Sequence, residues 1–112
     1  MSGMDEIVEY ALNESKVDYV GLWQVCGWVR RIFRPEDPSS AKQLVFEVVR
    51  ALLRNGLEAV DLAPPGEGCR PWTDQAPDAV IKRISEEWTA LGRNPNPGEA
   101  VWFHDPNLKP VD

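Results

Sequence analysis

The stretch DPSSAKQLVFEVVRALLRNGLEAVDL, residues 37–62, decides the fold, because it predicts a helix, a glycine stop and a strand in immediate succession. Asp37 suits the N-cap position and Pro38 the first turn, where the N–H that proline lacks would have no partner. Apolar residues then recur at helical spacing: Ala41, Leu44, Val45, Val48, Val49, Leu52 and Leu53. Gly56 supplies the left-handed residue that ends a helix, and residues 57–62 form an apolar run typical of a strand.

Two more helices are predicted before this stretch. Apolar residues between positions 4 and 12 form a narrow stripe, with acidic residues on the other side. Asp18 is expected to cap a second helix that runs to Phe33 and is apolar around much of its circumference. Gly21 and Gly27 weaken such a helix, and small residues at these positions predict the close approach of another helix.

Strands and a fourth helix are predicted after it. Residues 57–62 and 69–72 flank the turn sequence PPGEG and predict a β-hairpin, and Pro71 marks the second strand as an edge. Pro77 is expected at the first position of a fourth helix that carries Trp88 on its apolar stripe and ends at Gly92. Residues 99–103 have strand character and are expected to add to the hairpin.

The predicted fold class is therefore α+β: an N-terminal three-helix unit, a β-hairpin, a fourth helix and a final strand. Three helices before a hairpin is also the order of a winged-helix domain, although a three-helix bundle with an unrelated small sheet has the same order. At 112 residues we expect one globular domain over residues 1–105 and a poorly ordered tail over 106–112.

The net charge and the cysteine spacing limit the classes of protein to which the chain can belong. The net charge is −6, with +3 on residues 21–55 and negative charge on both flanks, which disfavours nonspecific attraction to nucleic acid or anionic membrane. Cys26 and Cys69 form no CxxC motif and are expected to be buried thiols. No signal peptide and no apolar run near the roughly 20 residues of a membrane helix is visible, so we expect a cytoplasmic protein.

No residue pattern indicates an enzyme. His104 beside Asp105 has the residue types of a base and its orienting group, but the sequence contains no nucleophile in an elbow motif, and a solvated histidine is the simpler interpretation. Glu86 and Glu87 point about 100° apart on a helix and do not converge. We therefore expect no catalytic residue, no metal and no cofactor.

The basic residues offer one alternative. Lys42, Arg50 and Arg54 lie on the helix that would be the recognition helix of a winged-helix DNA-binding regulator. The hairpin that would form the wing carries Glu58, Asp61 and Glu67 against Arg70, and these acids would repel a phosphate backbone. DNA binding is therefore kept only as the second hypothesis.

A partner surface is predicted on the hairpin and the start of the fourth helix. Trp72, at the end of the hairpin, is the tryptophan expected to protrude, and one of Trp23 and Trp28 is the other candidate for exposure. An exposed tryptophan among carboxylates suits a protein-binding hot spot. The first helix is also acidic but is interpreted as lacking an aromatic anchor. The predicted partner-binding residues are Glu58, Asp61, Glu67, Trp72, Asp74 and Asp78.

One sequence frame resembles a pattern shared by small bacterial proteins. It consists of LL-x-x-GL, PW, EW-x-x-LGR-x-P and G-x-x-VWF within residues 44–103. Its members are Leu52, Leu53, Gly56, Leu57, Pro71, Trp72, Glu87, Trp88, Leu91, Gly92, Arg93, Pro95, Gly98, Val101, Trp102 and Phe103. In size and acidity the chain is similar to immunity proteins encoded beside bacterial polymorphic toxins. The resemblance implies a partner, a cognate protein toxin such as a nuclease with a basic cleft, and no catalytic residues.

Overall fold

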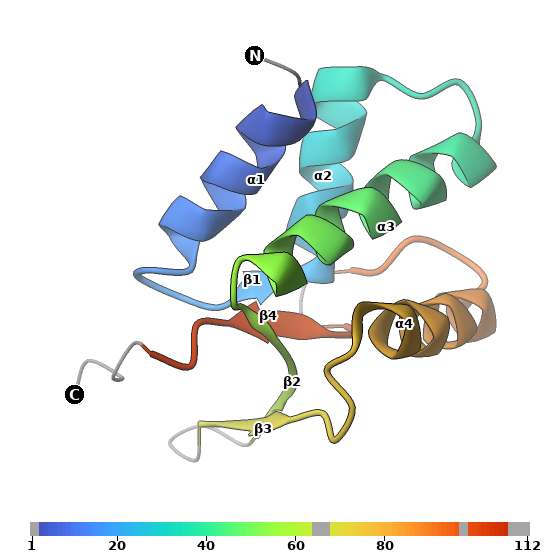
Figure 1. Ribbon diagram of the computed structural model, residues 1–112. Coiled ribbons are helices and arrows are strands. Elements are labelled where there is room, and N and C mark those ends of the chain that lie inside the picture. Colours follow the sequence, from blue (N-terminus) through green and yellow to red (C-terminus); the bar gives the residue numbers. More distant parts are fainter. Residues whose placement is uncertain (1–2, 64–67, 97–98, 108–112) are drawn as a thin grey trace.

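The computed structural model describes residues 3–63, 68–96 and 99–107 (Figure 1). In chain order its elements are α1 (Gly3–Glu14), β1 (Val20–Gly21), α2 (Leu22–Phe33), α3 (Pro38–Arg54), β2 (Glu58–Leu62), β3 (Cys69–Pro71), α4 (Pro77–Leu91) and β4 (Trp102–His104). Four helices and a four-stranded antiparallel sheet confirm the predicted α+β class for the described residues.

The sheet has the strand order β1-β4-β2-β3. The β2–β3 hairpin and the edge position of β3 confirm the expectations for Pro71, which pairs with Val60. The final strand joins the hairpin as predicted, but β4 lies inside the sheet because β1 pairs with its other side. Phe103 faces Ala59 on one neighbour and Val20 on the other. The short strand β1 was not predicted.

The ends of α3 and α4 follow the sequence signals. The Asp37 carboxylate accepts a hydrogen bond from the Ser40 backbone N–H at 2.8 Å, and Pro38 opens α3. Gly56 after α3 and Gly92 after α4 have φ of 93° and 69°, in the left-handed region that favours glycine. The stretch at residues 37–62 therefore folds as predicted.

The start of α2 differs from the prediction. Asp18 does not cap it; instead Gly21 precedes the helix, and the Gln24 side chain accepts a hydrogen bond from the Gly21 backbone N–H at 2.8 Å. The reason is the sheet: Val20 and Gly21 pair with β4, so these residues are extended and the helix starts later.

The glycines of this segment do not mark a close helix–helix approach. A Cβ on Gly21 would lie 2.5 Å from the Trp23 indole nitrogen and 3.1 Å from a Trp102 ring carbon, so the close neighbours are two tryptophan rings. A Cβ on Gly27 would meet nothing within 4 Å, so nothing packs closely there. The prediction of close helix packing at these two positions is wrong.

The core lies between the helices and the sheet. Helix α3 contacts α1, α2 and α4, and α1 to α3 lie together on one side of the sheet (Figure 1). On the predicted stripe of α3, Val45, Val48, Val49 and Leu52 are buried, whereas Ala41, Leu44 and Leu53 are half-buried. Phe103 and Trp88, which is 2% exposed, are buried as well. No helix in the described ranges is long and apolar enough to cross a lipid bilayer. Most of the predicted tail, residues 108–112, lies outside the described residues.

Candidate functional site

Trp72, the predicted anchor of the partner surface, is buried rather than protruding. It is 5% exposed. Its indole Nε1 donates a hydrogen bond to Asp61 Oδ1 at 3.0 Å, and the Arg83 guanidinium lies 3.8 Å from the ring centroid. The Trp72 backbone N–H donates a hydrogen bond to the Ala59 carbonyl at 2.9 Å, which holds Trp72 against β2. The prediction that Trp72 is exposed is wrong, because the hairpin places its ring beneath a cation from α4.

Three of the carboxylates predicted around Trp72 bind arginine side chains or a backbone N–H of the same protein. Asp61 Oδ2 lies 3.5 Å from Arg83 Nη2, and Asp78 Oδ1 lies 2.7 Å from Arg50 Nη1. Asp74 accepts a hydrogen bond from the Ala76 backbone N–H just before α4. The structure therefore brings Asp61 and Trp72 together, but they bond to each other and the ring of Trp72 stays buried.

Of the two remaining members of the predicted set, only Glu58 lies among the described residues. Glu58 is half-buried and pairs with His104 across the β2–β4 ladder. Glu67 lies outside the described residues. A role for the six residues in partner binding stays a prediction.

Two of the three cations predicted on the recognition helix contact neighbouring side chains. Lys42 Nζ lies 5.1 Å from the centroid of a Trp88 ring, and Arg50 forms its ion pair with Asp78. Arg54 is exposed at the end of α3. These contacts weaken the case for a phosphate-binding face on α3, and the absence of nucleic-acid binding stays a prediction.

The titratable residues considered for chemistry pack against neighbours. The His104 ring lies 5.4 Å from that of Tyr19, whose pKa is raised chiefly by burial. Burial also raises the pKa of the Cys26 thiol to about 11, so this thiol is protonated at neutral pH. Cys69 is only half-buried, contrary to expectation. In the part of the chain that the structure describes, no three metal-ligating side chains gather.

The acidic residues of α1 differ from those of the hairpin. Glu9 and Glu14 form no ion pair with any residue that the structure describes; the pairs found there join Arg50, Arg83 and Arg93 to other acids. Glu9 is exposed. Arg31 of α2 lines the same cleft as Tyr10 and Glu14, so Glu14 has a cation nearby but no ion pair with it, and the exposed Glu9 leaves negative potential on the solvent side of the helix.

An exposed aromatic residue lies among these acids. Tyr10 is 46% exposed, its hydroxyl donates to Glu6 Oε1 at 2.9 Å, and its ring lies 6.3 Å from that of Trp28 on α2. The hydrogen bond to Glu6 is the main cause of the raised Tyr10 pKa. The interpretation that this helix lacks an aromatic anchor is wrong. Tyr10 lies off the apolar stripe and four residues after Glu6, which was the available signal that it faces solvent.

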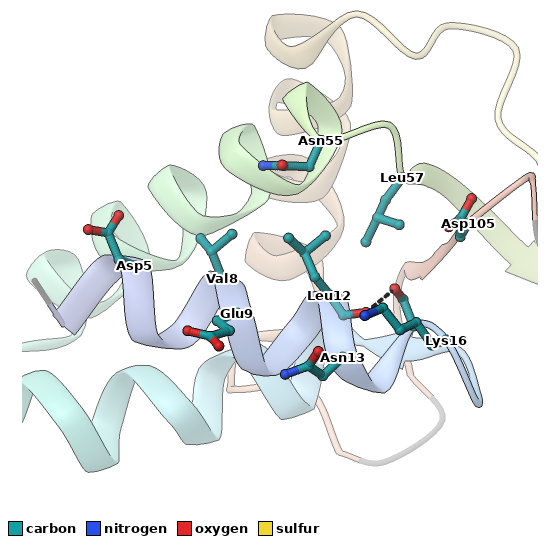
Figure 2. A pocket seen from close by; sticks show the side chains of 10 residues that line it. Asp5, Val8, Glu9, Leu12, Asn13, Lys16, Asn55, Leu57 and Asp105 are labelled. Atoms are coloured by element: carbon teal, nitrogen blue, oxygen red, sulfur yellow. Dashed lines mark hydrogen bonds between the residues drawn. The ribbon is translucent and has the colours of Figure 1, made fainter. Parts of the chain in front are cut away.

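We call this region the α1 surface, defined by Glu6, Glu9, Tyr10, Asn13 and Glu14 of α1 with Trp28 of α2. Two clefts flank it. One, of about 390 Å³, lies along α2 beside Tyr10 and Trp28. The other, of about 470 Å³, lies between α1, the end of α3 and the segment after β4 (Figure 2). We call it the α1–α3 cleft, defined by Val8, Leu12, Leu57, Glu9, Asn13 and Asp105.

Comparison of the chain with protein-family models, with curated proteins and with solved structures found no match. The resemblance of residues 44–103 to a bacterial sequence frame therefore stays a hypothesis. What the α1 surface can do follows from its chemistry: it offers carboxylates, an aromatic ring and two recesses, which suit recognition of a protein.

Proposed function

We propose that the chain is a binding protein of the immunity type, which neutralises a basic protein toxin in the cytoplasm through its α1 surface. One observation carries this proposal. Glu9 and Glu14, without ion pairs to described residues, flank the exposed Tyr10, whereas Asp61 and Asp78 are paired with arginines. The proposed site therefore moves from the hairpin to α1.

The two kinds of side chain on this surface have separate roles in binding. Exposed carboxylates speed the encounter with a positively charged partner, and their effect weakens with salt. An aromatic ring that becomes buried in the complex mainly slows dissociation, and tyrosine is enriched among such hot spots. Tyr10 already rests on Trp28 and bonds Glu6, so little side-chain freedom is left to lose on binding.

Neutralisation follows if the bound surface covers the working cleft of the toxin. A nuclease holds its substrate through cations that contact phosphates. The carboxylates of α1 would take the place of those phosphates, and the body of the protein would exclude the nucleic acid. This mechanism requires no catalytic residue in the chain.

Co-expression tests the proposal directly. The candidate toxin is the product of a gene that ends immediately upstream, produced from an inducible promoter together with the wild type, Glu9→Lys/Tyr10→Ala or Glu86→Lys. Glu86 is an exposed helix residue of α4 and serves as the charge control. We expect growth with the wild type and Glu86→Lys, and loss of protection with the α1 variant. Full protection by a folded α1 variant would contradict the proposal.

The DNA-binding alternative has its own test. Fluorescence anisotropy with duplex DNA should detect no tight complex. Salt-sensitive binding that disappears in Arg50→Ala/Arg54→Ala would support a regulator and contradict the immunity proposal.

A further inference from the structure

The α1–α3 cleft has an apolar floor. Figure 2 shows the side chains of Val8 and Leu12 rising from α1 toward the end of α3, and Leu57 pointing down toward them. Val8 and Leu12 are half-buried at the edge of the core, whereas Leu57 is 4% exposed. The cleft thus offers aliphatic surface to a group that enters between the two helices.

The charges on the cleft are mostly negative. Glu9 comes from α1, and Asp105 from the segment that follows β4, at the other side of the opening (Figure 2). Asp105 Oδ1 accepts a hydrogen bond from the Asn107 backbone N–H at 2.9 Å, which orients its carboxylate. Lys16 is the one cation among the described lining residues, and it is exposed.

An aliphatic floor beneath carboxylates complements a particular side chain. Lysine and arginine carry an apolar stem and a cationic head, and they bury the stem while the head stays near the surface. A stem on Val8 and Leu12 would leave the head within reach of the carboxylates at the rim. Leu57 is buried beneath this floor, so the contact area comes from the exposed parts of Val8 and Leu12.

We infer that the α1–α3 cleft receives a lysine- or arginine-bearing segment of the partner protein, with a side-chain stem on the floor and its cation at the acidic rim, where Glu9 and Asp105 stand at opposite sides. This inference rests on the proposed function and adds the chemistry of the partner. The groove between α3 and α4 is less suited, because Arg50 and Lys82 offset most of the charge of its acids, Glu47, Asp78 and Glu86, and Arg50 is paired with Asp78.

The test uses the whole protein and blocked synthetic peptides. We would titrate ¹⁵N-labelled protein with a peptide that alternates leucine and lysine, a leucine–glutamate peptide and a serine–lysine peptide, and follow the backbone amide shifts. Glu9→Lys/Asp105→Lys reverses the rim charges. Glu47→Lys/Glu86→Lys, on exposed positions of α3 and α4, carries the same net charge as a matched control.

We expect the leucine–lysine peptide to shift the amides of Val8, Leu12 and Leu57, and the cleft variant to bind it roughly tenfold more weakly, while the control variant binds nearly as well as the wild type. No binding, shifts spread over the surface, or equal weakening in both variants would overturn the inference. If the cleft fails this test while Glu9→Lys/Tyr10→Ala still abolishes protection, only the cleft assignment is wrong and the proposed function stands.

Discussion

Two acidic regions of this protein have similar composition and different surroundings. At the hairpin and α4, Asp61 lies against Arg83 and the Trp72 indole, and Asp78 against Arg50. On α1, Glu9 and Glu14 have no such partner among the described residues. The carboxylates of the first region bind other groups of the fold, whereas on α1 the exposed Glu9 and the half-buried Glu14 lie beside Tyr10 without an ion pair to any described residue.

This difference shows that acidic residues in a sequence do not by themselves indicate a binding surface. The cations that compensate the hairpin come from α3 and α4, far away in sequence. Helix α1 lies away from α4 (Figure 1), and Arg50 and Arg83 pair with acids of β2 and α4 rather than with Glu9 or Glu14. Arg31 of α2 lines the cleft beside Glu14 without an ion pair to it.

The largest expected effect concerns Trp72 and separates a structural role from a binding role. Because its ring is buried and its Nε1 bonds Asp61, Trp72→Ala should lower the free energy of unfolding by about 3–5 kcal/mol. Trp88→Ala, in the α3–α4 contact, should cost a similar amount. Chemical denaturation measures both. A loss below about 1 kcal/mol for Trp72→Ala would show that the ring is not part of the packed structure.

Tyr10 should behave in the opposite way. Tyr10→Ala is expected to weaken binding of the toxin by about 2 kcal/mol or more, mainly through faster dissociation. Its loss of folding stability should stay below about 1.5 kcal/mol, the upper range for an aromatic pair. Surface plasmon resonance and denaturation give the two values. Tyr10→Phe is the control, because it keeps the ring on Trp28 and removes only the bond to Glu6.

The Arg50–Asp78 pair should contribute little energy although its distance is short. The two side chains are 38% and 88% exposed, so water screens the 2.7 Å contact. A double-mutant cycle with Arg50→Ala and Asp78→Ala should give a coupling of about 0.2–1 kcal/mol. A coupling of zero, with toxin binding weakened by Asp78→Ala, would mean that Asp78 belongs to the partner surface after all.

The smallest effect is a pH dependence at the loop after α4. Arg93 donates to both Glu99 carboxylate oxygens, and this bonding is the main reason that the Glu99 pKa falls from 4.5 to about 2. A lowered acid pKa stabilises the fold above pH 4.5, and that stabilisation is lost as pH falls through about 2. Glu99→Gln should therefore melt below the wild type at pH 7, with the gap closing by pH 2. The same change at Glu9 should leave melting nearly unaltered at both pH values.

Local signals in the sequence predicted most of the fold. Asp37, Pro38, Gly56 and Gly92 act within one helical turn of themselves, so α3 and α4 begin and end as expected. The strand β1 was missed because Val20 and Gly21 become extended only by pairing with β4, some eighty residues later. The same long-range pairing moved the start of α2.

The candidate site was harder to predict for the same physical reason. Whether a carboxylate is compensated depends on cations brought near it by tertiary packing, as Arg50 is to Asp78. The burial of Trp72 likewise depends on Arg83 of another element. The exposure of Tyr10 could have been predicted from the sequence, because its position opposite the apolar stripe follows from helical periodicity alone.

The central claim is that α1, and not the hairpin, meets the partner. The measurement that tests it most directly is the association rate with the cognate toxin, by stopped flow, for Glu9→Lys/Glu14→Lys and for Glu58→Lys/Asp74→Lys, which carry equal net charge. We predict that the α1 variant associates roughly tenfold more slowly at low salt, with the difference vanishing at high salt, while the hairpin variant stays close to the wild type. A hairpin variant that is slowed as much as or more than the α1 variant would contradict the claim.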